Sequence, residues 1–338
     1  MKKCHLMKID NIELGEFPLL LAPMEDVSDP PFRAVCKQNG ADLMFTEFIS
    51  SEGLIRDAEK SVQKLDIYDD ERPIGIQIFG DKIDSMRQAA EISEKAKPEI
   101  LDINYGCPVK KVACRGAGAG ILLDLDKMQK MTAEIVKQVK IPVTVKTRLG
   151  WDENNIKIME VAERLQDVGI KALSIHGRTR KQMYKGEADW NYIAEVKNNP
   201  RIKIPIFGNG DVDSPEKALE YKNKYGVDGI MIGRAAIGNP WIFNEIKYYL
   251  KHKKRKSIPT IDERIDAVKK HLYFSIKWKG EKLGLVEMRR HYNNYFKGIE
   301  NFKEYRMRLV LSESINSSME TLEEISSIYT TKRETSLT

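Results

Sequence analysis

Polar residues interrupt several short apolar runs of this chain, and their side chains are of types that bind anions or transfer protons. They are, in chain order, Glu47, Gln77, Asp102, Asn104, Lys146, Arg148, His176, Asn209, Asp211 and Arg234. An ammonium group inside a run such as Pro-Val-Thr-Val-Lys (142–146) is costly unless an anion or a strong acceptor compensates it. Lys146 therefore indicates either a bound anionic group or a structural ion pair with Asp102 or Glu47.

Glycines accompany two of the apolar runs that end in polar residues. The sequences are Phe-Gly-Asn-Gly-Asp (207–211) and Ile-Gly-Arg-Ala (232–235). Glycine lets backbone amides approach a phosphate closely, although tight turns need glycine as well. At the ends of two consecutive runs, the two sequences together predict a phosphorylated ligand beside Gly210 and Gly233.

Cys107 follows Asn104-Tyr-Gly and precedes Pro108, which places it in a stiff loop after an apolar run. A nucleophilic thiol needs a general base beside it, and the Asn104 amide cannot act as one. We therefore expect Cys107 to donate a proton. Cys114, in the same loop, is expected to be incidental, and Cys36 is expected to lie in the core.

The composition excludes several classes of protein. With 41% hydrophobic and 31% charged residues, the chain is expected to be globular. No uncharged stretch approaches the roughly 18 to 20 apolar residues of a membrane span, and no apolar run precedes Asp10. We therefore expect a cytoplasmic protein without membrane contact. The four cysteines, Cys4, Cys36, Cys107 and Cys114, form no Cys-x-x-Cys pair, which argues against disulfides and against a metal site.

Eight apolar runs recur along the first two thirds of the chain, at residues 19–23, 43–48, 74–80, 100–106, 142–148, 172–177, 204–210 and 229–235. Most are apolar at successive positions, which is typical of parallel strands buried on both faces. Amphipathic segments such as residues 81–97, 126–140 and 156–168 lie between them, and Ser214 before Pro215 predicts a helix start. The pattern predicts an α/β fold, a (β/α)8 TIM barrel, with a doubly wound open sheet as the alternative.

After Trp241 the strand-like runs stop, and residues 261–278, 285–297 and 302–314 have apolar side chains at helical spacing. We expect a catalytic barrel domain over residues 1–244, a small all-α helical domain over residues 245–330 and a frayed tail over residues 331–338. The basic run Lys-His-Lys-Lys-Arg-Lys (251–256), followed by Pro259, predicts the linker between the two domains.

Positive charge concentrates in the second domain. Residues 1–243 hold 36 basic and 37 acidic side chains, whereas residues 247–308 hold 18 basic and 7 acidic ones. A local field of this kind attracts phosphate polymers, and the alternative is a solvated helical face. Arg289 and Arg290 in this segment, and Arg178 and Arg180 after the sixth run, are candidate phosphate contacts.

Eight segments spread over the chain carry a set of motifs. They are Leu-Ala-Pro-Met-Glu-Asp-Val-Ser-Asp (21–29), Ile-Gln-Ile-Phe-Gly (76–80), Asp-Ile-Asn-Tyr-Gly-Cys-Pro-Val (102–109), Val-Lys-Thr-Arg-Leu-Gly-Trp (145–151), Ile-His-Gly-Arg-Thr-Arg-Lys-Gln-Met-Tyr-Lys-Gly (175–186), Gly-Asn-Gly-Asp (208–211), Met-Ile-Gly-Arg-Ala (231–235) and Met-Arg-Arg-His-Tyr-Asn-Asn-Tyr-Phe-Lys-Gly (288–298). Together they resemble the tRNA-dihydrouridine synthase family, and most closely its bacterial B-type branch. The sequence departs from the family at Asn239, where many relatives have Arg, and in the basic run at residues 251–256.

The resemblance implies an oxidoreductase with FMN at the barrel mouth, and it gives most candidate residues a role. The backbone of Ala22, Pro23 and Met24 would line the flavin ring, Gln77, Lys146 and His176 would contact the ring, and Asn209, Gly210, Asp211, Gly233 and Arg234 would hold the phosphate. The helical domain would bind tRNA.

For the reaction, the resemblance implies that a tRNA uridine receives a hydride at carbon 6 from reduced FMN and a proton at carbon 5 from Cys107. Asn104 would position the base, and NADPH or NADH would be the reductant. No metal and no obligate protein partner is implied, so we expect a monomer. The alternatives are a different FMN enzyme acting on a free pyrimidine or an enone, and a non-catalytic RNA-binding protein.

Overall fold

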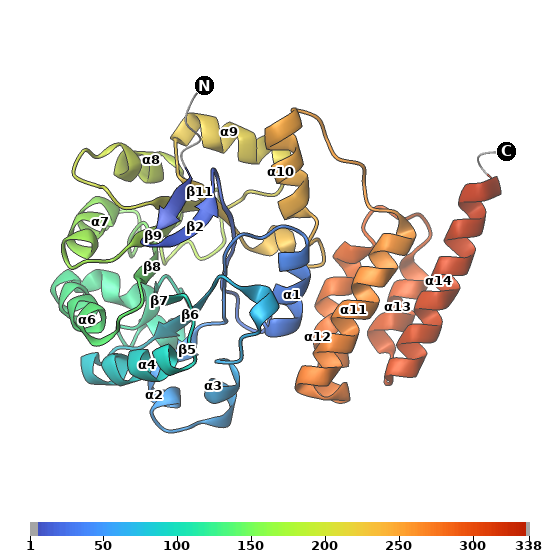
Figure 1. Cartoon of the computed structure of the whole chain (residues 1–338), viewed down its shortest axis with the longest axis horizontal. Helices are drawn as coiled ribbons and strands as arrows, with labels where there is room; N and C mark the ends of the chain where they lie inside the picture. Colours follow the sequence, from blue (N-terminus) through green and yellow to red (C-terminus); the bar gives the residue numbers. More distant parts are fainter. Residues whose placement is uncertain (1–5, 336–338) are drawn as a thin grey trace.

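The structure, a computed structural model, describes residues 6–335, and its larger part is a closed barrel of eight parallel strands (Figure 1). The strands are β3 (Leu19–Leu21), β4 (Met44–Phe45), β6 (Ile74–Phe79), β7 (Ile100–Tyr105), β8 (Val143–Arg148), β9 (Ala172–His176), β10 (Ile206–Asn209) and β11 (Gly229–Ile232). Neighbours in the barrel follow chain order, and β11 pairs with β3. A bridge between Leu20 and Leu43 closes the ring, and a short strand β5 (Ile49–Ser50) also pairs with β6. The predicted barrel is confirmed, because each barrel strand lies within its predicted apolar run.

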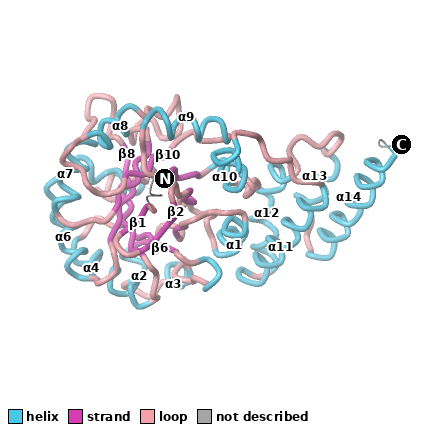
Figure 2. Tube along the Cα trace, turned by 45° about the horizontal axis from the view of Figure 1, so that its top comes forward, coloured by secondary structure: helices cyan, strands magenta, loops and turns pink. Residues whose placement is uncertain are grey.

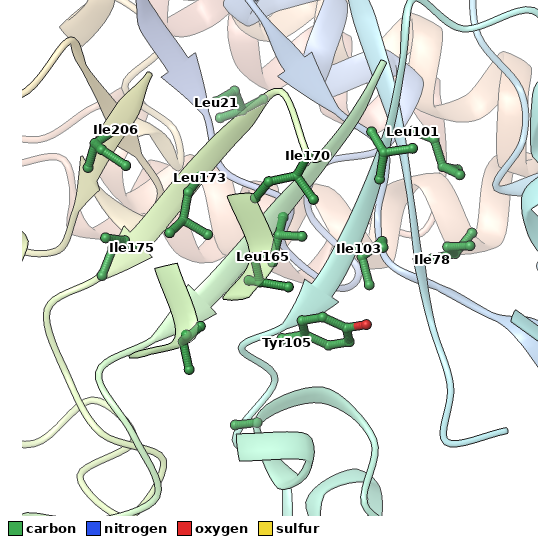
Figure 3. Packing of buried hydrophobic residues seen from close by; sticks show 14 of the residues in the cluster. Leu21, Ile78, Leu101, Ile103, Tyr105, Leu165, Ile170, Leu173, Ile175 and Ile206 are labelled. Atoms are coloured by element: carbon green, nitrogen blue, oxygen red, sulfur yellow. The ribbon is translucent and has the colours of Figure 1, made fainter. Parts of the chain in front are cut away.

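Helices surround the barrel, and their apolar faces cover the outward side chains of the strands. They are α1 (Pro30–Gln38), α2 (Ser51–Leu54), α3 (Glu59–Gln63), η1 (Asp69–Glu71), α4 (Ile83–Lys95), α5 (Lys110–Ala113), η2 (Gly118–Leu123), α6 (Leu125–Gln138), α7 (Ile158–Asp167), α8 (Asn191–Asn198), α9 (Pro215–Tyr225), η3 (Arg234–Ala236) and α10 (Ile242–His252). Leu165 of α7 shares one buried cluster with Ile103 of β7 and Leu173 of β9 (Figure 3). As predicted, Ser214 caps α9, accepting a hydrogen bond from the Lys217 amide at 3.4 Å.

A hairpin of β1 (Met7–Ile9) and β2 (Ile12–Gly15) precedes the barrel, although the sequence analysis predicts no element there. Its buried Ile9 and Leu14 pack with Leu20, Leu43 and Ile100. These last residues lie at or near the amino-terminal ends of their strands. The hairpin therefore covers the end of the barrel opposite to the polar strand ends.

Four further helices form a separate unit beside α1, called the helical domain below (Figures 1 and 2). They are α11 (Ile261–Lys279), α12 (Glu281–Tyr295), α13 (Lys303–Leu311) and α14 (Ile315–Thr335). The unit has its own apolar cluster, which includes Leu272, Met288 and Leu322. A capping box begins α11, because Thr260 and Glu263 each accept the other's backbone N–H.

In the structure, the boundary between the barrel and the helical domain lies later in the chain than residue 244. Ile242, Phe243 and Ile246 of α10 are buried in the barrel cluster, since the apolar face of this helix packs against α9. Helix α10 continues to His252, so the first two residues of the expected basic linker are helical. In the expected tail, residues 331–335 continue α14, and residues 336–338 lie outside the described residues. Among the described residues, no helix combines the length and apolar content that crossing a bilayer requires.

Candidate active site

A cavity of about 940 Å³ opens at the carboxyl ends of the barrel strands. The predicted site residues that line it are Ala22, Pro23, Met24, Asn104, Cys107, Lys146, His176, Arg178, Asn209, Gly210, Asp211, Gly233 and Arg234. Four predicted residues are not among its lining residues, namely Gln77, Arg180, Arg289 and Arg290. The barrel topology thus gathers most of the candidates at one mouth.

Cys107 lies in the loop after β7, where the chain itself fixes its position. Its backbone N–H donates to Oδ1 of Asn104 at 2.8 Å, and its carbonyl accepts from Ala119 at 3.0 Å. A side chain at Gly118 would come within 2.9 Å of Cys107, so the loop needs glycine there. Only 5% of the Cys107 side chain is exposed, and burial raises the pKa of its thiol. The thiol therefore keeps its proton at neutral pH, as a proton donor requires.

A buried hydrogen-bond network lies beneath the cavity floor and holds Asn104. Nδ2 of Asn104 donates to Gln77 at 2.8 Å, and Nε2 of Gln77 donates to Asp102 at 2.5 Å. Thr144 donates to the other carboxyl oxygen of Asp102 at 2.5 Å. Burial raises the pKa of Asp102 to about 6, against these hydrogen bonds. The family resemblance implies that Gln77 contacts the flavin ring. In the structure Gln77 is fully buried and bonds Asn104.

Lys146 and Arg148 are two residues apart on β8 and share its inward face. Burial and the nearby Arg148 lower the pKa of Lys146 to about 8. Among the described residues, neither Asp102 nor Glu47 forms an ion pair with Lys146, so the salt-bridge alternative is not found. Arg148 is held by the carbonyls of Gly106 at 2.7 Å, Met183 at 2.8 Å and Thr179 at 3.0 Å. In the cavity wall, Arg148 is thus a fixed cation, and Lys146 beside it is less constrained.

His176 and Arg178 form the next part of the wall. Burial, together with the positive charges of Arg148 and Lys146, lowers the pKa of His176 well below its usual range, so the ring is neutral. The sequence predicts that Arg178 meets RNA phosphates, but its side chain is only 2% exposed. It donates to Asp211 at 2.7 Å and to the Gly186 carbonyl at 2.5 Å. Arg178 is therefore a buried part of the wall, because its charge is neutralised inside the protein.

The glycine sequences after β10 and β11 lie side by side, as predicted. Nδ2 of Asn209 donates to the Met231 carbonyl at 2.8 Å and ties the two strands together. Gly210 has a φ of +125°, and a Cβ there would lie 2.6 Å from the Ala188 side chain. Arg234 is exposed and lies 3.3 Å from Asp211, whose pKa is lowered by hydrogen bonds from Arg178 and Ala188 although burial opposes them. This corner presents backbone and the exposed guanidinium of Arg234, which is paired with Asp211, beside the cavity.

The lining residues to which the sequence analysis gives no role in the site include Arg148, Tyr184 and Lys217. The sequence analysis names Arg148 as a polar residue of its run but assigns it no role, although alternation along β8 places it on the same strand face as Lys146. Tyr184 is 54% exposed, with the guanidinium carbons of Arg234 and Arg148 at 5.0 Å and 5.8 Å from its ring centre. Its place in a loop gives no periodic signal.

An acidic cluster at the cavity rim is also absent from the sequence prediction. Carboxyl oxygens of Glu25, Asp26 and Glu47 lie within 4.8 Å of one another. Lys64 lies 2.5 Å from Glu25 and 3.8 Å from Glu47. Burial raises the pKa of Glu47 to about 7, and the charge of Lys64 opposes this rise.

The remaining candidate RNA contacts lie outside the cavity. The guanidinium of Arg180 stacks over Trp151, 4.7 Å from the ring centre. Arg289 and Arg290 are exposed neighbours on α12. Arg290 donates a hydrogen bond to the backbone carbonyl of Asp26 in the barrel domain.

Comparisons with known proteins extend over both parts of the molecule. The family profile described as Dihydrouridine synthase (Dus) matches residues 20–330. A Rickettsia conorii protein named probable tRNA-dihydrouridine synthase is 37% identical over 331 residues, covering 98% of each chain. A Pseudomonas putida protein named tRNA-dihydrouridine synthase B is 38% identical over 301 residues, covering 88% of this chain and 89% of that one.

Solved structures of lower identity share the fold alone. Histamine dehydrogenase from Rhizobium sp. 4-9 matches with a TM-score of 0.58 at 12% identity, covering 80% of this chain and 50% of that one. A morphinone reductase variant in complex with tetrahydroNAD matches with a TM-score of 0.53 at 12% identity, covering 72% of this chain and 89% of that one. Because the family profile covers barrel and helical domain alike, and the named relatives span most of the sequence, the chain belongs to the dihydrouridine synthase family.

Proposed function

We propose that this chain is a tRNA-dihydrouridine synthase that uses FMN, with NADPH or NADH as reductant, to convert tRNA uridines to 5,6-dihydrouridine. The observation that carries the proposal is the buried thiol of Cys107 in one cavity with Lys146 and the glycine loops of β10 and β11. The names of the relatives support tRNA as substrate. The family match includes the helical domain, which a reductase of small free substrates does not need.

The residues present fit a flavin mononucleotide. Gly210, Gly233 and the exposed guanidinium of Arg234 suit a phosphate at one end of the cavity. Lys146, half-buried and without an ion pair among the described residues, calls for an anionic partner, which the reduced flavin ring provides. When bound, reduced FMN supplies the hydride for carbon 6 of the uracil.

Residues of this chain hold the base and supply the proton. Cys107 keeps its proton at neutral pH and gives it to carbon 5. Asn104 uses Oδ1 to hold the Cys107 loop and one Nδ2 hydrogen to bond Gln77, which leaves the second Nδ2 hydrogen for a uracil oxygen. We therefore assign Gln77 to holding Asn104. The neutral His176 offers a hydrogen bond without adding charge to the wall.

The helical domain would hold the tRNA while the target base leaves its stack. The excess of 18 basic over 7 acidic residues at 247–308 attracts the RNA backbone, and exposed Arg289 is one candidate contact.

Nucleoside mass spectrometry tests the proposal. Dihydrouridine is quantified in tRNA from cells with and without the gene, and in unmodified tRNA incubated with purified protein and a nicotinamide cofactor. We expect the modified nucleoside only with the protein, and we expect extracted FMN in the purified protein. A colourless protein that leaves uridine unchanged would contradict the proposal, whereas a yellow protein that reduces only small free substrates would favour a different flavoenzyme.

A further inference from the structure

The loop between β3 and α1, residues 22–29, belongs to both halves of the molecule. Ala22, Pro23, Met24, Glu25 and Val27 of this loop line the cavity. Its last residue, Asp29, caps α1, accepting a hydrogen bond from the Phe32 amide at 2.9 Å. The loop therefore forms one wall of the cavity, directly before the helix against which α11 packs.

Barrel residues hold the loop from one side. Asp26 has a φ of +55°, a left-handed conformation that needs support from its surroundings. Its backbone N–H donates to the buried Glu47 carboxylate at 2.5 Å. The Met24 amide donates to the Ser28 hydroxyl at 2.8 Å, which closes the loop on itself.

The helical domain holds the same loop from the other side. Arg290 of α12 donates to the carbonyl of Asp26, the residue whose N–H is held by Glu47. Lys279, at the end of α11, lies 2.7 Å from Asp29, and both side chains are buried. Between the two units, Phe32 packs against His271 and His291, with ring centres 5.6 Å and 5.0 Å apart. The backbone of Asp26 is thus held between the two domains.

We propose that Arg290 is a positioning residue, which fixes the cavity wall at residues 23–28 and so makes the geometry of the reaction depend on the helical domain. This inference rests on the proposed function and goes beyond RNA binding. Arg289, the residue before Arg290, is also an exposed arginine of α12. Among the described residues, however, the structure gives Arg289 no contact with the loop at residues 22–29. The two arginines therefore have different tasks, one toward the barrel and one toward the RNA.

The matched pair Arg290→Ala and Arg289→Ala separates these tasks in the full-length holoenzyme. For Arg290→Ala we expect kcat for dihydrouridine formation to fall roughly tenfold, because a displaced wall misaligns the reacting groups, together with a shifted flavin absorption spectrum. For Arg289→Ala we expect a higher KM for tRNA with an unshifted flavin spectrum. Arg290→Lys retains a donor and should restore kcat to within a few-fold of wild type.

Amide hydrogen exchange of residues 22–29 gives a readout that does not depend on activity. Exchange should accelerate in Arg290→Ala and stay at the wild-type rate in Arg289→Ala. If Arg290→Ala instead raises only KM, as Arg289→Ala does, and leaves exchange and spectrum unchanged, Arg290 is an RNA contact and the inference is wrong. A failure of the wild-type protein to form dihydrouridine would contradict the proposed function, whereas the exchange comparison would still decide the inference.

Discussion

The barrel mouth and the helical domain both carry positive charge, but they hold it in different ways. At the mouth, Arg148 and Arg178 are buried and fixed by carbonyl oxygens and by Asp211. In the helical domain most basic side chains are exposed, and within residues 247–308 they outnumber acidic ones by 18 to 7. Fixed cations select one anionic group of defined shape, whereas free cations attract a charged polymer without defining its position. On the proposed function, positive charge serves the chemistry in the barrel and the attraction of RNA in the helical domain.

The largest effect should come from Cys107, which belongs to the mouth alone. Cys107→Ala should lose roughly 10²- to 10⁴-fold in the rate of dihydrouridine formation, because a positioned proton donor is removed. Flavin reduction by the nicotinamide cofactor and tRNA binding should persist, measured by absorbance and by filter binding. Exposed Cys114 provides the control, and an equal loss in Cys114→Ala would transfer the role to that thiol.

Lys146 tests whether a cation at the mouth acts on the flavin. Lys146→Met should slow flavin reduction by roughly 10²-fold or release the flavin, because the charge that stabilises the reduced ring is lost. In the wild type, the reduction rate should fall as the pH rises through about 8, where Lys146 loses its proton, and the variant should lack this dependence. Full flavin content and full activity in the variant would show that Lys146 does not contact the ring.

The same residue should affect the stability of the flavin-free protein. Burial lowers the pKa of Lys146 from 10.5 to about 8, so the unfolded chain binds the proton more tightly than the folded one. The free energy of unfolding should therefore rise as the pH rises from 8 to 10.5, and this rise should be smaller in Lys146→Met. Urea unfolding at several pH values measures it, and equal pH dependence in both proteins would contradict the pKa shift.

Charges between the two regions should matter more for stability than charges on the surface. Lys279 is 6% exposed and pairs with buried Asp29 and with Glu287, so Lys279→Met removes the cation from both carboxylates and should cost roughly 3 kcal/mol in the free energy of unfolding. Lys269 pairs with exposed Glu323 at 3.7 Å, and Lys269→Met should cost less than about 1 kcal/mol. Equal losses in urea unfolding would mean that the Lys279 pair has no special role.

The smallest effect should come from one free charge of the helical domain. Arg289→Glu should weaken tRNA binding and make the slope of log affinity against log salt shallower, by about 0.7 to 0.9 for each phosphate that the protein no longer neutralises. Flavin content should not change. An unchanged slope would mean that Arg289 only solvates its helix, and Arg180 beside Trp151 would become the next candidate for binding a phosphate.

The sequence predicts most of the barrel because its strands are buried on both faces, so each appears as an apolar run of the expected length. It also brings most site residues to the right end, since polar residues at the ends of parallel strands meet at one mouth. The sequence does not indicate how deeply each of these side chains is buried below the mouth of the barrel. Gln77 is polar and on a strand like Asn104, yet it lies one layer deeper and bonds Asp102 instead of facing the cavity.

Other differences arise from contacts between distant parts of the chain. The sequence around Arg178 is that of an exposed loop arginine, because its partner Asp211 is distant in the chain. The contact of Arg290 with Asp26 joins residues 264 positions apart. The hairpin at residues 7–15 is too short for its periodicity to be recognised, and only the open end of the barrel explains its burial. Such features depend on tertiary structure, which no local pattern records.

The β1–β2 hairpin also bears on the order in which the reactants arrive. Because Ile9 and Leu14 fill the amino-terminal end of the barrel, reactants reach the cavity through its opposite face. On the proposed function, the nicotinamide cofactor and a folded tRNA share that entrance, so one must depart before the other is admitted. Turnover then alternates between two half-reactions. Plots of the reciprocal initial rate against the reciprocal concentration of the nicotinamide cofactor, at several fixed tRNA concentrations, should therefore be parallel lines.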